Sequence, residues 1–308
     1  MAARGYLRGA HGLRRILLGA SAATLFRAGS TTARAKSYKT SWGEPKPEDL
    51  LKMNADFDEI VAVDTTKMEW AASPMPAVER KRVFLHGTKE AGKVTSVVRY
   101  APGSKFRKHP HPEGEEFLVL KGVFSDDSGD YGPGTYCLNP EGFVHAPWSK
   151  PGCEIIVRLR QHPNLEEKGG GVWSWLGMQQ QQGKTKPRTH TVVLPHQGNW
   201  VAEKEWGDGV TRKMLYQEDM QGYEDATWLE KVTPGSSRKR GVPQGMVEEV
   251  FVIEGCITAA GGSRKSGTWI RHPEGTNTLQ AEEDTTLYVR QFPIDMIAPS
   301  HKGSSQST

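Results

Sequence analysis

The chain has few cysteines and no apolar run long enough to cross a membrane. Among its 308 residues there are 3 cysteines, an odd number, and no C-x-x-C pair. A disulfide framework is therefore not expected, and a reducing compartment is the simpler assumption. The apolar stretch at residues 16–26 lies between Arg15 and Arg27 and is too short to span a bilayer. The cysteines are expected to be small, buried, apolar side chains: Cys137, Cys153 and Cys256.

Acidic residues are missing from residues 1–43, where eight Arg and Lys residues occur. A segment rich in Arg, Ser and Thr but without acids is typical of a mitochondrial presequence, which we assign to residues 1–40. A mitochondrial location is therefore expected, with a plastid transit peptide as the alternative. The rest of the chain has 32 basic against 36 acidic residues. This balance predicts neither a nucleic-acid nor a membrane partner.

Apolar residues make up only 36% of the chain, whereas 34 glycines and 19 prolines supply many turns. That composition suits short strands better than long helices. The length allows two ordinary domains.

The sequence repeats itself once. The segment Glu115–Gly122 corresponds to Glu248–Gly255, and Gly134–Gly142 corresponds to Gly267–Gly275. A repeat of this length is a duplicated domain. We predict a first barrel over 50–165, a linker over 166–190, a second barrel over 191–295 and a disordered tail over 296–308.

Short segments bounded by Gly and Pro predict four strands in each copy. They are Val94–Tyr100, Phe117–Leu120, Gly134–Leu138, Glu154–Gln161, Thr227–Val232, Val250–Ile253, Thr268–Ile270 and Thr285–Gln291. Phe117–Leu120 is apolar at every position, which indicates a strand covered on both faces. The predicted fold class is all-β, with two tandem jelly-roll barrels.

Four residues of the first copy have the spacing of metal ligands. His109 and His111 form an H-x-H, which on a strand directs both imidazoles to one face. Glu115 follows a short turn, and His145 comes after a Pro and Gly turn that could direct it to the same point. Three imidazoles and a carboxylate suit one divalent metal ion: Fe or Zn foremost, with Mn, Ni or Cu possible.

The second copy has lost the imidazoles. By sequence spacing, Gly241 corresponds to His109, a position near Pro243 to His111, and Thr278 to His145; only Glu248 remains. One carboxylate does not hold a transition metal tightly. The second barrel is therefore predicted to lack a metal. A structural role is favoured over a ligand pocket of different chemistry.

The two motifs of the first copy resemble the signatures of the cupin superfamily. These are G-x5-H-x-H-x3-4-E-x6-G, found at Gly103–Gly122, and G-x5-P-x-G-x2-H-x3-N, found at Gly134–Ser149 with Ser replacing the final Asn. The first copy is most similar to ChrR-like cupins, which include the metal-binding domain of certain anti-sigma factors and proteins similar to acetylacetone-type dioxygenases. The resemblance implies the same four ligands but no single reaction, because cupins host several.

Three functions remain open. A mononuclear Fe(II)-type dioxygenase acting on a diketone or aryl ketone is favoured, followed by a non-catalytic Zn-binding sensor and by a metal-dependent lyase or isomerase with Tyr131 or Tyr136 as base. A small-molecule substrate is expected, and a homodimer through the strand faces is the second partner considered. Candidate pocket residues are Phe106, Tyr136, Trp148 and Arg99. For Arg99, Arg158 and Arg160, an outward, solvated position is favoured over one that holds an anion.

Overall fold

The computed structural model describes residues 50–87, 92–159, 188–218 and 225–294. The predicted presequence, the tail and most of the linker lie outside these residues. Nearly all of the described elements are strands, with one short 3-10 helix, η2 (Thr65–Lys67). No helix of the described residues is long and apolar enough to span a membrane.

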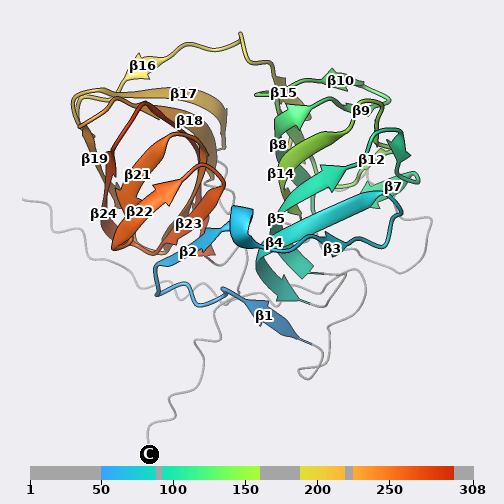
Figure 1. Cartoon of the computed structure of the whole chain (residues 1–308), viewed down its shortest axis with the longest axis horizontal. Coiled ribbons are helices and arrows are strands. Elements are labelled where there is room, and N and C mark those ends of the chain that lie inside the picture. Colours follow the sequence, from blue (N-terminus) through green and yellow to red (C-terminus); the bar gives the residue numbers. More distant parts are fainter. Residues whose placement is uncertain (1–49, 88–91, 160–187, 219–224, 295–308) are drawn as a thin grey trace, which may run out of the picture. The chain divides into compact units, whose positions relative to one another are not determined.

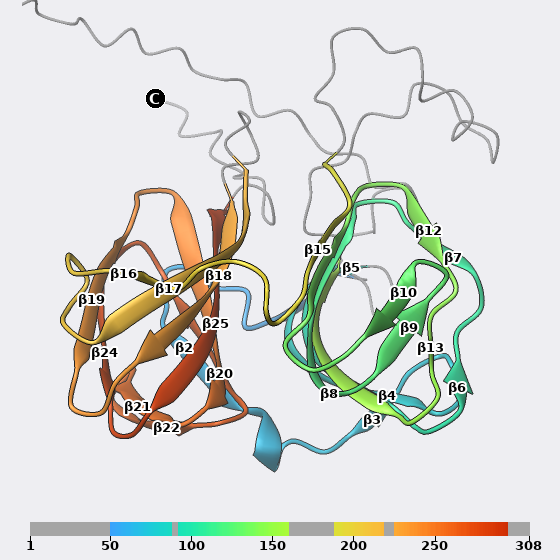
Figure 2. The same cartoon turned by 90° about the horizontal axis from the view of Figure 1, so that it is seen from above.

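One face of the first barrel is a large antiparallel sheet (Figures 1 and 2). Its strands are β1 (Leu51–Met53), β3 (Ala71–Ala72), β4 (Val78–Gly87), β5 (Gly92–Tyr100), β8 (Glu115–Gly122), β11 (Tyr136–Asn139), β14 (Cys153–Leu159) and β15 (Thr191–Val193). Two small sheets form the opposite face. They contain β6 (Ser104–Lys105), β9 (Phe124–Asp126), β10 (Gly129–Tyr131) and β13 (Trp148–Ser149), and β7 (His109–His111) with β12 (Phe143–His145).

The second barrel has the same arrangement. The large sheet contains β2 (Val61–Asp64), β16 (Val201–Ala202), β17 (Val210–Gln217), β18 (Ala226–Val232), β20 (Met246–Glu254), β23 (Thr268–His272) and β25 (Thr285–Pro293). The small sheet contains β19 (Ser237–Val242), β21 (Cys256–Ala259), β22 (Gly262–Lys265) and β24 (Gly275–Ala281). The predicted all-β class with two tandem jelly rolls is confirmed, and each of the eight predicted strands overlaps an observed one.

The two copies exchange edge strands. Strand β2 precedes the first barrel in sequence but pairs antiparallel with β23 of the second, with Val61 opposite Arg271. Strand β15 precedes the second barrel but pairs with β11 of the first, with Val193 opposite Tyr136. Each large sheet is thus completed by a segment from the other copy (Figure 1).

Apolar side chains gather in three clusters, one inside each barrel and one between them. Alternation along β8 explains the division: Phe117 and Val119 face the interior of the first barrel, whereas Leu118 faces the cluster between the barrels. Both faces of this strand are buried, as its uniformly apolar sequence predicted. Strand β20 does the same in the second barrel, where Val250 faces inward and Phe251 faces the first copy.

Charged residues at the centre of the contact between the barrels follow an approximate twofold pattern. Glu116 accepts hydrogen bonds from Arg158 (2.8 Å) of its own copy and from Thr227 (3.1 Å) of the other. Glu249 accepts bonds from Arg158 (2.8 Å) and Thr95 (3.3 Å), both of the first copy. Arg158 is therefore buried and ion-paired, which corrects the expectation of a solvated position. Burial alone would raise the pKa of Glu116, but Arg290 and Arg158 outweigh it and lower that pKa.

The motif glycine repeated at the end of β8 and directly after β20 has a steric cause. Gly122 has φ +71°, and a Cβ there would lie 1.9 Å from the carbonyl oxygen of Gly152. Gly255, its counterpart, has φ +89°, and a Cβ would lie 2.4 Å from the carbonyl oxygen of Asp284. Both turns need a residue without a side chain.

Candidate metal centre

Three imidazoles of the first barrel converge on one point. His109 and His111 come from β7, and His145 comes from β12, whose register places it directly opposite His109. One nitrogen of each ring lies within 4.8 Å of those of the other two. The carboxylate of Glu115, at the start of β8, approaches to 3.5 Å from His111 Nε2 and 3.6 Å from His145 Nε2. The four predicted ligands are therefore brought together. Among the described residues, the three histidines are the one group found with metal-site geometry, and Glu115 lies beside them.

Hydrogen bonds to the outer ring nitrogens orient two of the imidazoles. His145 Nδ1 lies 3.0 Å from Asp126 Oδ2, and His109 Nδ1 lies 2.8 Å from the carbonyl oxygen of Arg107. With the Nδ1 protons donated outward, the Nε2 lone pairs point inward. His145 Nε2 then faces His111 Nε2 at 3.0 Å. A cation held between such nitrogens would satisfy their lone pairs, so the donor set fits a divalent transition metal.

Burial and neighbouring charges shift the pKa values of Glu115 and His145 in opposite directions. Burial raises the pKa of Glu115, against the opposing charge of His145 and a hydrogen bond of 2.9 Å donated by Asn139 Nδ2. Burial would lower the pKa of His145, but the bond to Asp126 and the charge of Glu115 outweigh it, so that pKa is raised. Both shifts reflect a carboxylate and an imidazole held close together in an apolar site, where a bound cation would favour the deprotonated forms.

The candidate pocket residues have different positions. The Phe106 ring lies 5.1 Å from that of His109 and so borders the centre. Trp148 is half-buried on β13. Tyr136 is buried in the cluster between the barrels and does not line the centre. Arg99 is a half-buried partner of Glu79 (3.1 Å from Nε) above the Trp70 ring, which corrects its proposed place in the pocket. Strand alternation explains why Tyr136 and Arg99 do not line the centre: each side chain lies on the face of its strand that points out of the barrel.

Asp126 and Asn139 hold two of the predicted ligands, His145 and Glu115, and sequence reasoning missed them. Asp126 is fully buried; besides His145 it accepts bonds from Tyr131 Oη (3.2 Å) and the backbone N–H of Ser128 (2.8 Å). The internal repeat contained a signal. Counted from the motif glycines, Asp126 corresponds to Ala259, so the copy without imidazoles also lacks this carboxylate.

A salt-bridge cluster replaces the metal centre in the second barrel. Glu248 accepts bonds from Arg238 (2.8 Å) and from Arg240, both on β19. Burial alone would raise the pKa of Glu248, but these guanidiniums lower it to about 2. The strand register also changes the correspondence between the copies. His145 lies opposite His109 in the first copy, so their counterparts should pair in the second, but Thr278 pairs with Lys239 and not with Gly241.

The chain shows two matches to one family profile and several structural similarities. The profile of the ChrR cupin-like domain matches residues 58–163 and 188–295. The chain belongs to this cupin family. No curated protein gave a significant match.

Among solved structures, this cupin is similar to a presumed dioxygenase from Nostoc punctiforme (TM-score 0.59, 18% identity, covering 81% of this chain and 88% of that one). It is also similar to the pirin YhhW from Escherichia coli in complex with nickel(II) (TM-score 0.55, 12% identity, 76% and 99% covered). A third similar structure is protein Ylba from E. coli (TM-score 0.54, 10% identity, 77% and 92% covered). At these identities the similarity shows the cupin fold.

Replacing Asp126 should weaken metal binding without removing a ligand. In Asp126→Asn, the carboxylate that fixes the tautomer of His145 is lost, and we expect metal affinity to fall by about 10- to 100-fold. Competition with a chromophoric chelator measures this. Asp130→Asn is the control, because Asp130 lies on the adjacent β10 and accepts a bond from Ser125 instead. Equal affinities of the two variants would contradict the role of Asp126.

A buried histidine of the second barrel predicts a pH dependence of stability. Burial lowers the pKa of His272 from 6.5 to about 4. The unfolded chain therefore binds the proton first, and stability is lost as the pH falls from 6.5 to 4. The loss should be about 3 kcal/mol. His272→Asn should remove this component, so urea unfolding at pH 7 and pH 4.5 should differ less than in the parent. An unchanged difference would contradict the assignment.

Proposed function

We propose that this cupin is a mononuclear metal-dependent dioxygenase that uses Fe(II) and acts on a small organic substrate such as a diketone or aryl ketone. One observation carries the proposal: His109, His111, His145 and Glu115 direct their donor atoms to one point inside the first barrel. Iron bound there would supply open coordination positions for substrate and O₂. The similarity to a presumed dioxygenase supports the proposal at the level of the fold.

The residues around the ligands suit an apolar, planar substrate. Phe106 lies against His109, and the Phe143 ring lies 5.6 Å from that of His145. The Phe124 ring lies 6.3 Å from that of His145. These rings offer aromatic surface to a bound ketone. Asp126 keeps the proton of His145 on Nδ1, so the Nε2 position remains available to the metal.

A non-catalytic zinc-binding module is the second candidate. Three imidazoles and one carboxylate equal the four protein ligands of a structural zinc site. The lyase or isomerase alternative receives less support, because its two candidate bases are poorly placed. Burial raises the pKa of Tyr131, whose hydroxyl donates to Asp126, and burial also raises the pKa of Tyr136, which lies between the barrels.

Metal analysis combined with oxygen uptake tests the proposal. Protein purified without added metal should contain iron near one equivalent per chain and should consume O₂ with at least one of a set of β-diketones and hydroxylated aryl ketones. Uptake should be absent in His145→Ala and unchanged in His272→Asn. Stoichiometric zinc without uptake for any substrate would favour the second candidate.

We propose a mitochondrial location on the basis of the acid-free residues 1–43. Fusion of residues 1–45 to a fluorescent reporter should direct the reporter into mitochondria. The reason is that mitochondrial import selects amphipathic, Arg-rich segments that lack acidic residues. Microscopy with an organelle marker measures this. A matched fusion with Arg4, Arg8, Arg14 and Arg15 replaced by Gln should remain cytosolic. Plastid import would support the alternative, and cytosolic retention of the unaltered fusion would contradict both.

A further inference from the structure

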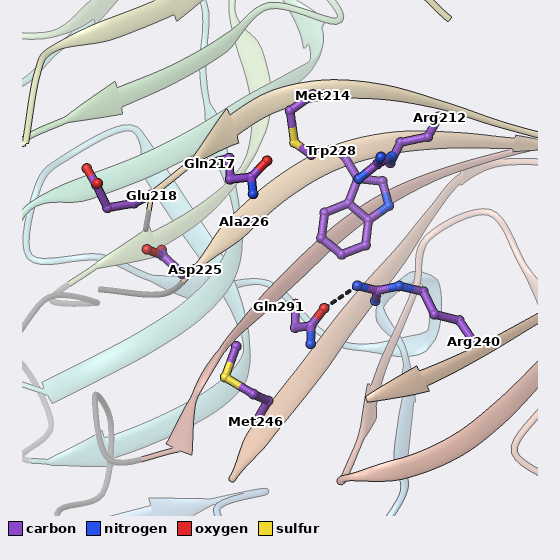
Figure 3. Close-up of a pocket in the computed structure, with 10 residues that line it drawn as sticks. All are labelled: Arg212, Met214, Gln217, Glu218, Asp225, Ala226, Trp228, Arg240, Met246 and Gln291. Carbon is purple, nitrogen blue, oxygen red and sulfur yellow. Dashed lines mark hydrogen bonds between the residues drawn. The ribbon is translucent and has the colours of Figure 1, made fainter. Parts of the chain in front are cut away.

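A cavity of about 300 Å³ lies in the second barrel, between β17, β18, β19, β20 and β25 (Figure 3). It borders the salt-bridge cluster that replaces the metal centre, because Arg240 belongs to both. The side chains of Met214, Trp228 and Met246 give it apolar walls. Its volume is at the lower end of the range of small-molecule sites.

The Arg240 guanidinium is held rigidly at the cavity wall. It donates to Glu248 and to Gln291, and its central carbon lies 4.6 Å from the Trp228 ring and 4.9 Å from the Trp206 ring. A cation fixed in this way by a carboxylate, an amide and two indoles loses little conformational freedom when it meets an anion.

Arg212 offers hydrogen-bond donors at the same end. Its Nε donates to Glu203 (2.6 Å), and its guanidinium lies 5.1 Å from the Trp206 ring. Its two Nη atoms make no hydrogen bond to any of the described residues. Figure 3 shows this guanidinium beside Trp228, on the same side of the cavity as Arg240 and Gln291. Paired N–H groups of Arg match the two oxygens of a carboxylate.

The opposite end of the cavity is acidic. Glu218 and Asp225 lie there, away from the two arginines (Figure 3). Asp225 is neutralised by Arg188 (3.0 Å) and Arg290 (3.0 Å), and Glu218 accepts a bond from Tyr216 (3.0 Å). A ligand hydroxyl at this end could donate to the carboxylate oxygens of Glu218 and Asp225.

We propose that the second barrel binds a small hydroxylated organic acid in this cavity, independently of metal. The carboxylate is bound by Arg212 and the amide of Gln291, beside the fixed charge of Arg240. The apolar body lies against Trp228 and between the two methionines. The hydroxyl at the far end donates to the acidic side. In the second copy, an anion site thus takes the place of the metal site, and Glu248 occupies the position of Glu115.

Titration calorimetry on the full chain tests this with 4-hydroxybenzoate as the probe. One equivalent should bind to the metal-free protein and to His111→Ala with equal affinity. The Arg212→Gln variant should bind at least ten-fold more weakly, as expected for the loss of a charged hydrogen-bond partner. The neutral isostere 4-hydroxybenzamide should also bind at least ten-fold more weakly than the acid.

Arg99→Gln is the matched control. Like Arg212, Arg99 is a partly exposed arginine paired with one glutamate and stacked over a tryptophan, but it belongs to the first barrel. Its replacement should leave binding unchanged. Three results would each overturn the proposal: equal binding by Arg212→Gln and the parent, loss of binding when metal is removed, or no saturable binding of benzoate, 4-hydroxybenzoate or 4-hydroxyphenylacetate in the millimolar range.

Discussion

The His111→Ala variant should contain far less than one equivalent of metal per chain, while its barrel remains folded. His111 is buried at the centre of the ligand group, with its Nε2 atom 3.0 Å from that of His145 and 3.5 Å from Glu115. Removal of this imidazole leaves two nitrogens and one carboxylate, a set that binds divalent metals much more weakly. Elemental analysis of protein purified without chelators, together with circular dichroism, measures both effects.

The matched control is His272→Asn. His272 is a buried imidazole of the second barrel that lies opposite Glu248, as Asn139 lies opposite Glu115. Asn therefore reproduces the residue found at this position in the first copy, and the metal content should stay at the parent level. Full metal content in both variants would disprove the site.

A fragment ending at Gln161 should aggregate or unfold far below the melting temperature of the whole chain. The truncation removes β15, which leaves β11 as an open sheet edge, and it removes the partner of β2. It also uncovers the apolar face around Leu118 and takes Glu249 away from the buried Arg158. Breaking one buried ion pair alone typically costs about 3–5 kcal/mol.

Differential scanning fluorimetry and size-exclusion chromatography measure this outcome. A fragment ending at Ile294 is the control, because it removes only residues beyond the last described element and keeps both large sheets complete. It should retain the stability of the full chain. A monomeric, fully stable and metal-loaded fragment ending at Gln161 would show that the first barrel does not depend on the second.

The local features of the fold could be predicted from the sequence. Strands such as Val250–Ile253 are short, apolar and bounded by turns, so they can be predicted without tertiary information. The ligand spacing could be predicted for the same reason: residues two apart on a strand share a face, and this rule is sufficient to bring His109 and His111 together. The buried, unpaired state of the cysteines follows from their small number and is confirmed.

Features that depend on pairing between distant segments could not be predicted. Nothing in the local pattern of Val61–Asp64 or Thr191–Val193 specifies that each strand completes the sheet of the other copy. Arg158 looked like a solvated residue because its carboxylate Glu249 is supplied from the second barrel. Counting spacings placed the lost imidazoles at Gly241, near Pro243 and at Thr278. In the structure, Arg238 and Arg240 of β19 contact Glu248 instead.

The exchange of edge strands has a consequence for how the chain folds during synthesis. Residues 61–64 leave the ribosome about 200 residues before their partners at 268–272, and the sheet of the first barrel stays incomplete until residues 191–193 emerge. Contacts between residues so far apart in sequence slow folding, because the entropy cost of closing the loop comes before the stabilising contacts form. After residues 191–193 have emerged, the outer apolar face of the first barrel still lacks its cover from the second copy. We therefore expect the chain to reach its native state late, and its incomplete sheets to depend on chaperones while translation continues.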